Sequence, residues 1–311
     1  MGTRRFAGPV AVALVVALLG ILSTSHRADA AGTRETALHD HAITVGSFDF
    51  AESELLAEIY SQTLEHNGFR VRRAFRLGPR EFVAPAFRGG LLELVPEYAG
   101  TALQFVSLGS VRPGPDLVET RAALVHALAG ESVVVLDSAP AQDANAFAVS
   151  RATADRYNIR TLTDLAAVAS RLTFGGSPEC ESRPLCLVGL QRVYGITFDE
   201  FVALDASGPL THEALRDRVI DVALLFTTDP AIEQDDLVAL ADDRNLQPAE
   251  NITPLVRTEV LDRFGPRLAS LVNTTSARLT TDKLRDLNAQ VADGRRARAV
   301  AARFLAAEGL Q

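Results

Sequence analysis

Residues 43–75 read ITVGSFDFAESELLAEIYSQTLEHNGFRVRRAF, and this stretch predicts a strand, a helix and a second strand. Residues 42–46 form a short run of β-type residues. In residues 53–67 apolar side chains recur at helical spacing, and Gly68 ends the predicted helix. Residues 69–75 then alternate as a strand does. The segment therefore predicts a strand–helix–strand unit.

The same alternation continues through the chain. Further strands are predicted at 91–96, 132–136, 172–174 and 220–226, and further helices at 81–87, 117–128, 187–194, 211–218, 280–292 and 297–308. The last sixty residues are expected to be mostly helical. Strands that alternate with helices predict an α/β fold with mainly parallel sheets and helices on both faces. Because no repeat or low-complexity linker divides the chain, we expect two interleaved lobes, with a ligand in the crevice between them.

The composition is that of a folded, acidic protein. The chain has 311 residues, 47% of them hydrophobic and 23% charged, with a formal net charge of −8. Nucleic acids and anionic lipid surfaces attract clusters of Lys and Arg rather than an acidic surface. We therefore do not expect the protein to bind nucleic acid.

Residues 1–30 have the pattern of a signal peptide. Arg4 and Arg5 precede an apolar core at 10–22, and Ala28–Asp29–Ala30 offers a cleavage site. The alternative is an uncleaved anchor helix, although the apolar stretch is short for a span. No cysteine lies near the cleavage site, so a lipoprotein is not expected. The chain is predicted to be secreted across the cytoplasmic membrane into an extracellular or periplasmic compartment.

The two cysteines are Cys180 and Cys186. Export would place them where a disulfide can form and persist, so a disulfide is favoured over two free thiols. A metal site would need more ligands than the adjoining Glu179 and Glu181. We therefore expect neither a bound metal nor a cofactor.

Two segments combine a strand end with a helix start, where backbone N–H groups can face a ligand. In residues 43–52 the turn carries small and acidic residues, which could equally well cap the helix. In residues 94–103 the strand leads to Tyr98 and Thr101. Tyr98 offers an aromatic face and Thr101 a hydroxyl, but a half-buried tyrosine and an ordinary helix cap explain them equally well.

Several motifs occur in one order along the chain. They are GSFDFAESELLAEIYSQTLEHNGF (46–69), LGPRE (77–81), PEYAGTAL (96–103), APAQDANAFAV (139–149), SPECESRPLCLVGLQRVYG (177–195), RVIDVALLFTTDPAI (218–232), LADD (240–243), LTTDKLRDLN (279–288) and VAARFLAAEGL (300–310). Together they resemble the osmoprotectant receptors of ABC importers, which bind glycine betaine, choline or carnitine. The resemblance covers nearly all of the chain after residue 45.

The resemblance implies a two-lobed periplasmic-binding-protein-like fold of type II, with the ligand in a cleft between the lobes. Lobe one would comprise 42–142 and 232–311, and lobe two 143–231. The segments APAQDANAF and FTTDP would be the two crossings between the lobes. The implied partners are an ABC permease and its ATPase, which the protein would meet at the membrane as a monomer.

The resemblance also implies a set of ligand-contacting residues. In chain order they are Phe48, Asp49, Tyr98, Thr101, Asn145, Arg183, His212 and Phe226. Tyr98 matches a tyrosine of the family's aromatic cage, which holds a trimethylammonium group by cation–π attraction. Thr101 matches a hydroxyl donor, and Arg183 an arginine that holds the ligand's carboxylate.

Three cage positions differ from the family pattern. Asn145, His212 (alternatively Thr211) and Phe226 stand where relatives have tyrosine, and Phe48, followed by Asp49, replaces a lysine. Losing two cation–π faces costs roughly 1–4 kcal/mol. We therefore expect either a quaternary ammonium compound or a more polar compatible solute.

An enzyme is not expected. The chain contains no G-x-S-x-G elbow, H-E-x-x-H motif, P-loop or G-x-G-x-x-G fingerprint. Two alternatives to a transport receptor remain: a ligand-sensing subunit of a signalling receptor with the same fold and, with less support, an exported enzyme.

Overall fold

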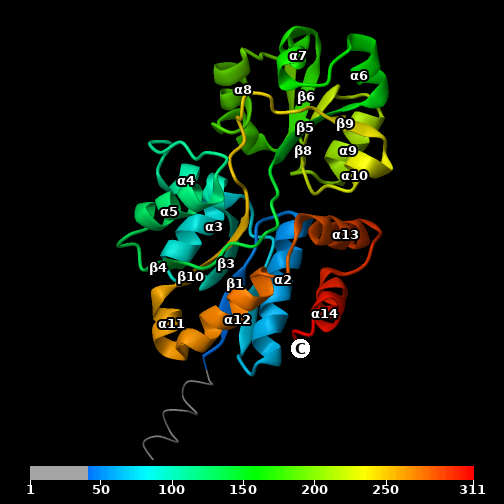
Figure 1. Cartoon of the computed structure of the whole chain (residues 1–311). Coiled ribbons are helices and arrows are strands. Elements are labelled where there is room, and N and C mark those ends of the chain that lie inside the picture. The colour runs from blue at the N-terminus through cyan, green and yellow to red at the C-terminus, as the bar shows by residue number, and fades with distance from the viewer. Residues whose placement is uncertain (1–40) are drawn as a thin grey trace, which may run out of the picture. The chain divides into compact units, whose positions relative to one another are not determined.

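The computed structural model describes residues 41–311, which form two α/β lobes (Figure 1). The predicted signal peptide, residues 1–30, lies outside the described residues. Within residues 41–311, none of the helices combines the length and the apolar character that a membrane span needs.

The first lobe is built on one five-stranded sheet. Its strands are β1 (Ile43–Gly46), β2 (Val71–Ala74), β3 (Leu94–Tyr98), β4 (Val133–Val135) and β10 (Ile252–Arg257). Its helices are α2 (Ala51–His66), α3 (Arg80–Arg88), α4 (Ala99–Val106), α5 (Leu117–Ala127), α11 (Thr258–Phe264), α12 (Pro266–Ser276), α13 (Thr281–Ala292) and α14 (Ala297–Ala307).

The second lobe is built on a second five-stranded sheet. Its strands are β5 (Asn145–Ser150), β6 (Thr173–Gly176), β7 (Glu200–Ala203), β8 (Val222–Phe226) and β9 (Leu237–Ala239). Its helices are α6 (Arg151–Tyr157), α7 (Leu162–Ala166), α8 (Leu187–Tyr194), α9 (Pro209–Arg216) and α10 (Ala231–Gln234), with 3-10 turns η1 (Ala169–Arg171) and η2 (Pro178–Glu181).

The two sheets share one topological plan. Their strand orders are β2-β1-β3-β10-β4 and β7-β6-β8-β5-β9. β1 is parallel to β2 and β3, whereas β10 is antiparallel to β3 and β4. In the second sheet β6 is parallel to β7 and β8, and β5 is antiparallel to β8 and β9. The α/β prediction is confirmed, and each sheet is mixed because the strand that follows a crossing runs against its neighbours.

The chain crosses between the sheets twice, and only the first crossing lies where it was expected. Residues 136–144, which include most of APAQDANAF, connect β4 to β5. FTTDP was expected to be the second crossing, and that prediction is wrong. After FTTDP the chain forms α10 and then β9, which pairs with β5 in the second sheet. The second crossing is therefore residues 240–251, and residues 237–239 belong to lobe two rather than lobe one.

The two crossing segments pair with each other. The backbone N–H of Asp143 donates to the carbonyl of Glu250 at 3.0 Å, and that of Ile252 donates to the carbonyl of Ala141 at 3.0 Å. Gln142 and Asn251 form an antiparallel bridge between these two bonds. The lobes are thus joined by a short two-stranded connection that brings the side chains of Asp143 and Glu250 close to one cavity.

Each lobe has its own hydrophobic core. In the first lobe α2 packs against the sheet and against α12, α13 and α14. This explains why α2 is buried over most of its circumference. Tyr60 is one of its buried residues, and its hydroxyl is hydrogen-bonded to that of Ser276 at 2.9 Å. The second core contains Phe147 and Phe174, with ring centroids 6.0 Å apart.

The strand β10 was not predicted, because the last sixty residues were expected to be mostly helical. Its sequence contains Pro254, and a proline usually argues against a central strand since it cannot donate to the ladder. In the structure Pro254 lies opposite Pro96 of β3, in a strand that lies between β3 and β4. Two residues without N–H groups therefore share one register position.

Gly100, in the first turn of α4, allows the second crossing to pass very close to the helix. A Cβ at this position would lie 2.3 Å from Cγ of Pro248 and 2.9 Å from the carbonyl oxygen of Ala249. Contacts this short cannot be relieved by a side-chain rotation alone, because one partner is backbone and the other a proline ring.

We predict that Gly100→Ala lowers the free energy of unfolding by about 1–3 kcal/mol, the usual cost of overpacking a close contact. Gly114→Ala is the matched control, since a Cβ at Gly114 meets no atom within 4 Å. Urea unfolding followed by circular dichroism measures both variants. Equal stability of the two variants would contradict the close approach of the crossing to α4.

Candidate functional site

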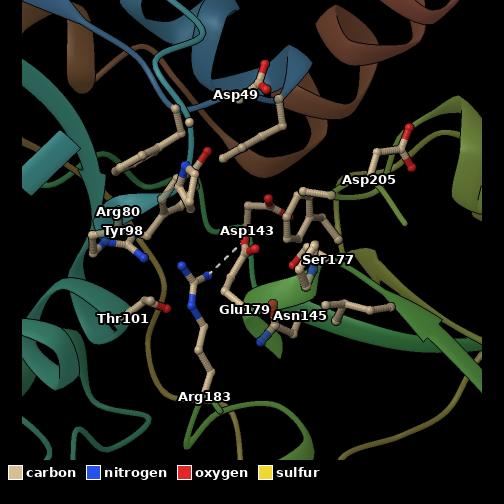
Figure 2. Close-up of a pocket in the computed structure, with 18 of the residues that line it drawn as sticks. Asp49, Arg80, Tyr98, Thr101, Asp143, Asn145, Ser177, Glu179, Arg183 and Asp205 are labelled. Carbon is tan, nitrogen blue, oxygen red and sulfur yellow. Dashed lines mark ion pairs between the residues drawn. The ribbon is translucent and has the colours of Figure 1, made fainter. Parts of the chain in front are cut away.

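A cavity of about 380 Å³ lies between the lobes (Figure 2). Most of its lining comes from loops that follow strands at their carboxyl ends. Phe48–Phe50 follow β1, Tyr98 ends β3, Ser177–Glu179 follow β6, Leu204–Ala206 follow β7, and Phe226 ends β8. The cavity therefore lies in the expected crevice between the lobes, beyond the carboxyl ends of the strands.

Aromatic rings from both lobes line the cavity. Phe50 lies at the centre of the group, with its ring centroid 5.1 Å from that of Phe226 and 6.0 Å from that of Tyr98. Phe48 stacks parallel to Phe50 at 6.1 Å. Rings of this kind present negative faces to a cation. We call Phe48, Phe50, Tyr98 and Phe226 the aromatic wall.

Tyr98 is held by a buried carboxyl group. Its hydroxyl donates to Oε1 of Glu52 at 2.8 Å, and the whole residue is 6% exposed. Burial, reinforced by the negative charges of Glu52 and Asp143, raises the pKa of the Tyr98 phenol well above its usual range. The tyrosine therefore remains neutral, and its hydroxyl is occupied within the protein.

Glu52 and Asp143 form a buried carboxyl pair where the lobes meet. Glu52 also accepts hydrogen bonds from the Thr228 hydroxyl at 2.5 Å and from the Asn288 amide at 2.6 Å. Asp143 accepts from the backbone N–H of Thr228 at 3.0 Å. Burial raises the pKa of both carboxyls, and the two side chains hydrogen-bond each other. Such a bond requires a proton on one of the two.

Glu250 is a further buried carboxyl in the cavity lining. It is 2% exposed and accepts hydrogen bonds from the backbone N–H of Thr101, at 3.0 Å, and from the Thr101 hydroxyl. Burial raises the pKa of Glu250 to about 7, although the bonds from Thr101 and the charge of Arg80 act against the increase.

The two arginines that line the cavity are paired with carboxylates. Arg80 forms a buried bidentate pair with Glu97 at 2.9 and 2.7 Å, and its guanidinium lies 4.7 Å from the ring centroid of Phe48. Arg183 lies 2.9 Å from Glu81, a residue of the other lobe, and 3.7 Å from Glu179. In Figure 2 Arg183 points into the cavity beside Glu179.

The loop that carries Arg183 is closed by a disulfide. Cys180 and Cys186 are bonded, as predicted from the sequence. Gly189 permits the close packing of helix α8 on this loop, because a Cβ at Gly189 would meet the Pro184 carbonyl oxygen at 2.1 Å. The disulfide and the helix together hold Arg183 at the cavity.

A family model matches residues 41–307 of the chain. It describes OpuAC, the substrate-binding domain of ABC-type glycine betaine transport systems. The chain belongs to this family. It is therefore a substrate-binding protein of ABC transport systems of this kind, as the sequence resemblance predicted.

Curated relatives of this OpuAC-family protein have related names. The glycine betaine-binding protein YehZ of Escherichia coli is 28% identical over 86% of this chain and 90% of the relative. A glycine-betaine-binding protein of Pseudomonas aeruginosa is 27% identical over 80% of this chain and 82% of the relative. An ergothioneine transport permease/ergothioneine binding protein, EgtU of Helicobacter pylori, is 24% identical over 82% of this chain. The match spans only 45% of EgtU.

Solved structures show the same fold. A glycine betaine/carnitine/choline ABC transporter structure superimposes with a TM-score of 0.68 at 24% identity, over 86% of this chain and 99% of the other. Apo YehZ from Escherichia coli gives a TM-score of 0.62 at 25% identity, over 87% and 99% of the two chains. The OpuAC-family protein therefore has the type II periplasmic-binding-protein fold, as expected.

Seven of the eight expected ligand-contacting residues line the cavity. They are Phe48, Asp49, Tyr98, Thr101, Asn145, Arg183 and Phe226. Some of their polar groups are already engaged: the hydroxyl of Thr101 donates to Glu250, and the amide of Asn145 donates to the Leu185 carbonyl at 3.0 Å.

His212 is not part of this cavity. It lines a second cavity of about 550 Å³, which shares Phe50 and Phe226 with the first, and its Nε2 lies 2.8 Å from Asp229. Burial lowers the pKa of His212, but the hydrogen bond and charge of Asp229, together with the charges of Asp205 and Asp235, raise the pKa overall. The alternative residue, Thr211, is buried and bonded to Asp205.

Three important residues of the OpuAC-family cavity were not anticipated: Phe50, Asp143 and Glu250. Phe50 had a usable signal, since it follows Phe48 by two positions in the same turn between β1 and α2. Asp143 and Glu250 lie in the crossing segments, where no periodic pattern indicates which side chains face inward. Among residues 41–311, no group of three or more His, Cys, Asp or Glu is placed to hold a metal ion.

We predict that Asp143→Asn increasingly stabilises the protein as pH rises. The folded-state pKa of Asp143 is raised, so its contribution to stability is largest at low pH and is lost as pH rises through that pKa. Asparagine cannot ionise. The melting temperature of the variant minus that of the wild type should therefore increase by at least about 2 °C between pH 4.5 and 8.5.

The exposed Asp199 supplies the control, as Asp199→Asn. Its melting temperature should follow that of the wild type across the same pH series. A constant margin for Asp143→Asn would show that the buried pair does not titrate with folding.

Proposed function

We propose that this chain captures a quaternary ammonium solute in the cavity between its lobes and delivers it to an ABC permease. The aromatic wall is the observation that carries the proposal. Phe50 and Tyr98 come from one lobe and Phe226 from the other. The ring centroids of Tyr98 and Phe226 lie 6.0 and 5.1 Å from that of Phe50. A trimethylammonium group placed among them gains about 0.5–2 kcal/mol from each face it contacts.

The electrostatic character of the cavity supports a cationic ligand group. Asp143 and Glu250 line the cavity, are buried, and have no arginine or lysine as a hydrogen-bond partner in the described part of the chain. A cation is favoured beside such carboxyls because it stabilises their ionised forms, which burial disfavours. The names of the relatives agree, since they refer to glycine betaine, carnitine and ergothioneine.

The cellular setting follows from the same proposal. The protein acts outside the cytoplasmic membrane, after export directed by residues 1–30, and docks as a monomer on a permease served by an ATPase. Import is preferred to the sensing alternative because the relatives are named for binding and transport. No chemical step on the solute is required for this role.

We predict that at least one of four solutes raises the melting temperature of the protein. The four, tested one at a time, are choline, glycine betaine, carnitine and ergothioneine. A ligand at a hundred times its Kd stabilises the folded state by about 2.7 kcal/mol. This corresponds to roughly 5–10 °C for a chain of this size. Because the chain has no tryptophan, the readout is dye-based thermal shift or calorimetry rather than intrinsic tryptophan fluorescence.

Phe50→Leu should weaken binding of that solute by about 2–30-fold, the loss of one cation–π face. Phe82→Leu is the matched control, because Phe82 is 68% exposed and lies outside the cavity. Absence of a shift with all four solutes at millimolar concentration would refute the proposal. If the two variants bind the solute with equal affinity, the solute does not bind at the aromatic wall.

A further inference from the structure

The first turn of α4 lies beside the cavity, and its N–H groups are taken. The N–H of Ala99 donates to the Asn251 carbonyl at 3.1 Å and that of Gly100 to the Ala249 carbonyl at 3.0 Å. The N–H of Thr101 donates to the side chain of Glu250 at 3.0 Å. A helix start of this kind is a common seat for a ligand's carboxylate. Here the second crossing fills it with the protein's own groups.

The cationic side chains at the cavity are also engaged. Arg80 is paired with Glu97, and Arg183 with Glu81 and Glu179. Both guanidinium groups therefore already have carboxylate partners. A carboxylate brought by a ligand would have to share a guanidinium group with a carboxylate that is already paired with it, and the two negative charges would repel each other.

Glu250 lies where an incoming carboxylate would be repelled. Its carboxyl is fixed by two hydrogen bonds from Thr101, and its backbone carbonyl is fixed by the N–H of Asp143. A carboxylate has about four lone-pair positions, so Glu250 can still accept a hydrogen bond from a ligand. The charged groups that act on it are Arg80, which attracts, and Glu97, which repels.

We infer that Glu250 is a specificity-determining residue that selects quaternary ammonium solutes whose second polar group is a hydrogen-bond donor over those that carry a carboxylate there. The inference rests on the proposed function and deepens it by naming the class of solute. Discrimination of this kind uses a repulsive element as well as an attractive one. Asp143, on the paired crossing, adds a second carboxyl to the same cavity.

The titration of Glu250 gives the inference a second readout. Its pKa of about 7 means that it is mostly protonated at pH 6 and mostly ionised at pH 8. The ionised form attracts a donor or a cation more strongly and repels a carboxylate. Preference for the donor-bearing solute should therefore increase as pH rises through 7.

Choline and glycine betaine are suitable probes because they share the trimethylammonium head. Choline ends in a hydroxyl group and glycine betaine in a carboxylate, and neither titrates between pH 6 and 8. Isothermal titration calorimetry of the full chain should show tighter binding of choline at pH 8, by about tenfold or more, as expected for a hydrogen bond to a charged group. The ratio of the affinity for choline to the affinity for glycine betaine should be lower at pH 6.

Glu250→Gln keeps the shape of the side chain and removes its charge. We expect choline to bind more weakly and glycine betaine more tightly in this variant, so that the affinity ratio drops by about tenfold and no longer depends on pH. Glu250→Asp retains the charge and should retain a preference for choline. Glu119→Gln is the matched control, since Glu119 is exposed on α5 and lies outside the cavity.

The outcomes distinguish failure of the proposed function from failure of the selection by Glu250. If neither probe nor any other quaternary ammonium solute binds the wild type, the proposed function fails and the inference fails with it. If glycine betaine binds at least as tightly as choline, the cavity is used but the selection by Glu250 is overturned. If choline is preferred and Glu250→Gln leaves the ratio unchanged at both pH values, the discrimination resides elsewhere and the inference is overturned.

Discussion

The antiparallel pairing of the two crossing segments is the constraint on which the cavity depends. Asp143 donates through its backbone to Glu250, and Ile252 donates to Ala141, so the two segments cannot shift independently. The same pairing places one buried carboxyl from each crossing in the cavity lining. The connection between the lobes and the chemistry of the cavity therefore rest on the same few residues.

This arrangement has a cost in stability. Burial raises the pKa of Glu52, Asp143 and Glu250, which means that their charged forms are disfavoured in the folded state. Arg80 and Glu97 show the usual solution, a buried bidentate pair. A carboxyl group that is buried without such a partner reduces stability at neutral pH. Residues of this kind are typically retained where they contribute to function.

The sequence predicted much of the fold and only part of the site. Periodicity identified most helices and the strands β1, β2, β3, β4, β6 and β8, because apolar spacing reports directly on burial. It did not identify β5 or β7. It missed β10, in which Pro254 obscures the strand pattern, and it misplaced the second crossing, since the short strand β9 gives little signal. Family motifs indicated seven cavity residues but not Glu250, whose position depends on how an irregular segment packs on α4.

An aromatic face that is lost at one position of the sequence can be supplied by a residue at another position that lies nearby in space. Asn145 and His212 stand where tyrosines were expected, and His212 does not line the cavity. Phe50, two residues beyond Phe48 in the turn after β1, reaches Phe226 at 5.1 Å. Phenylalanine offers a ring without a hydroxyl, so it can attract a cation but cannot recognise a polar group. In a cavity walled largely by such rings, polar recognition must come from other groups, and the buried carboxyls of the crossings are placed to provide it.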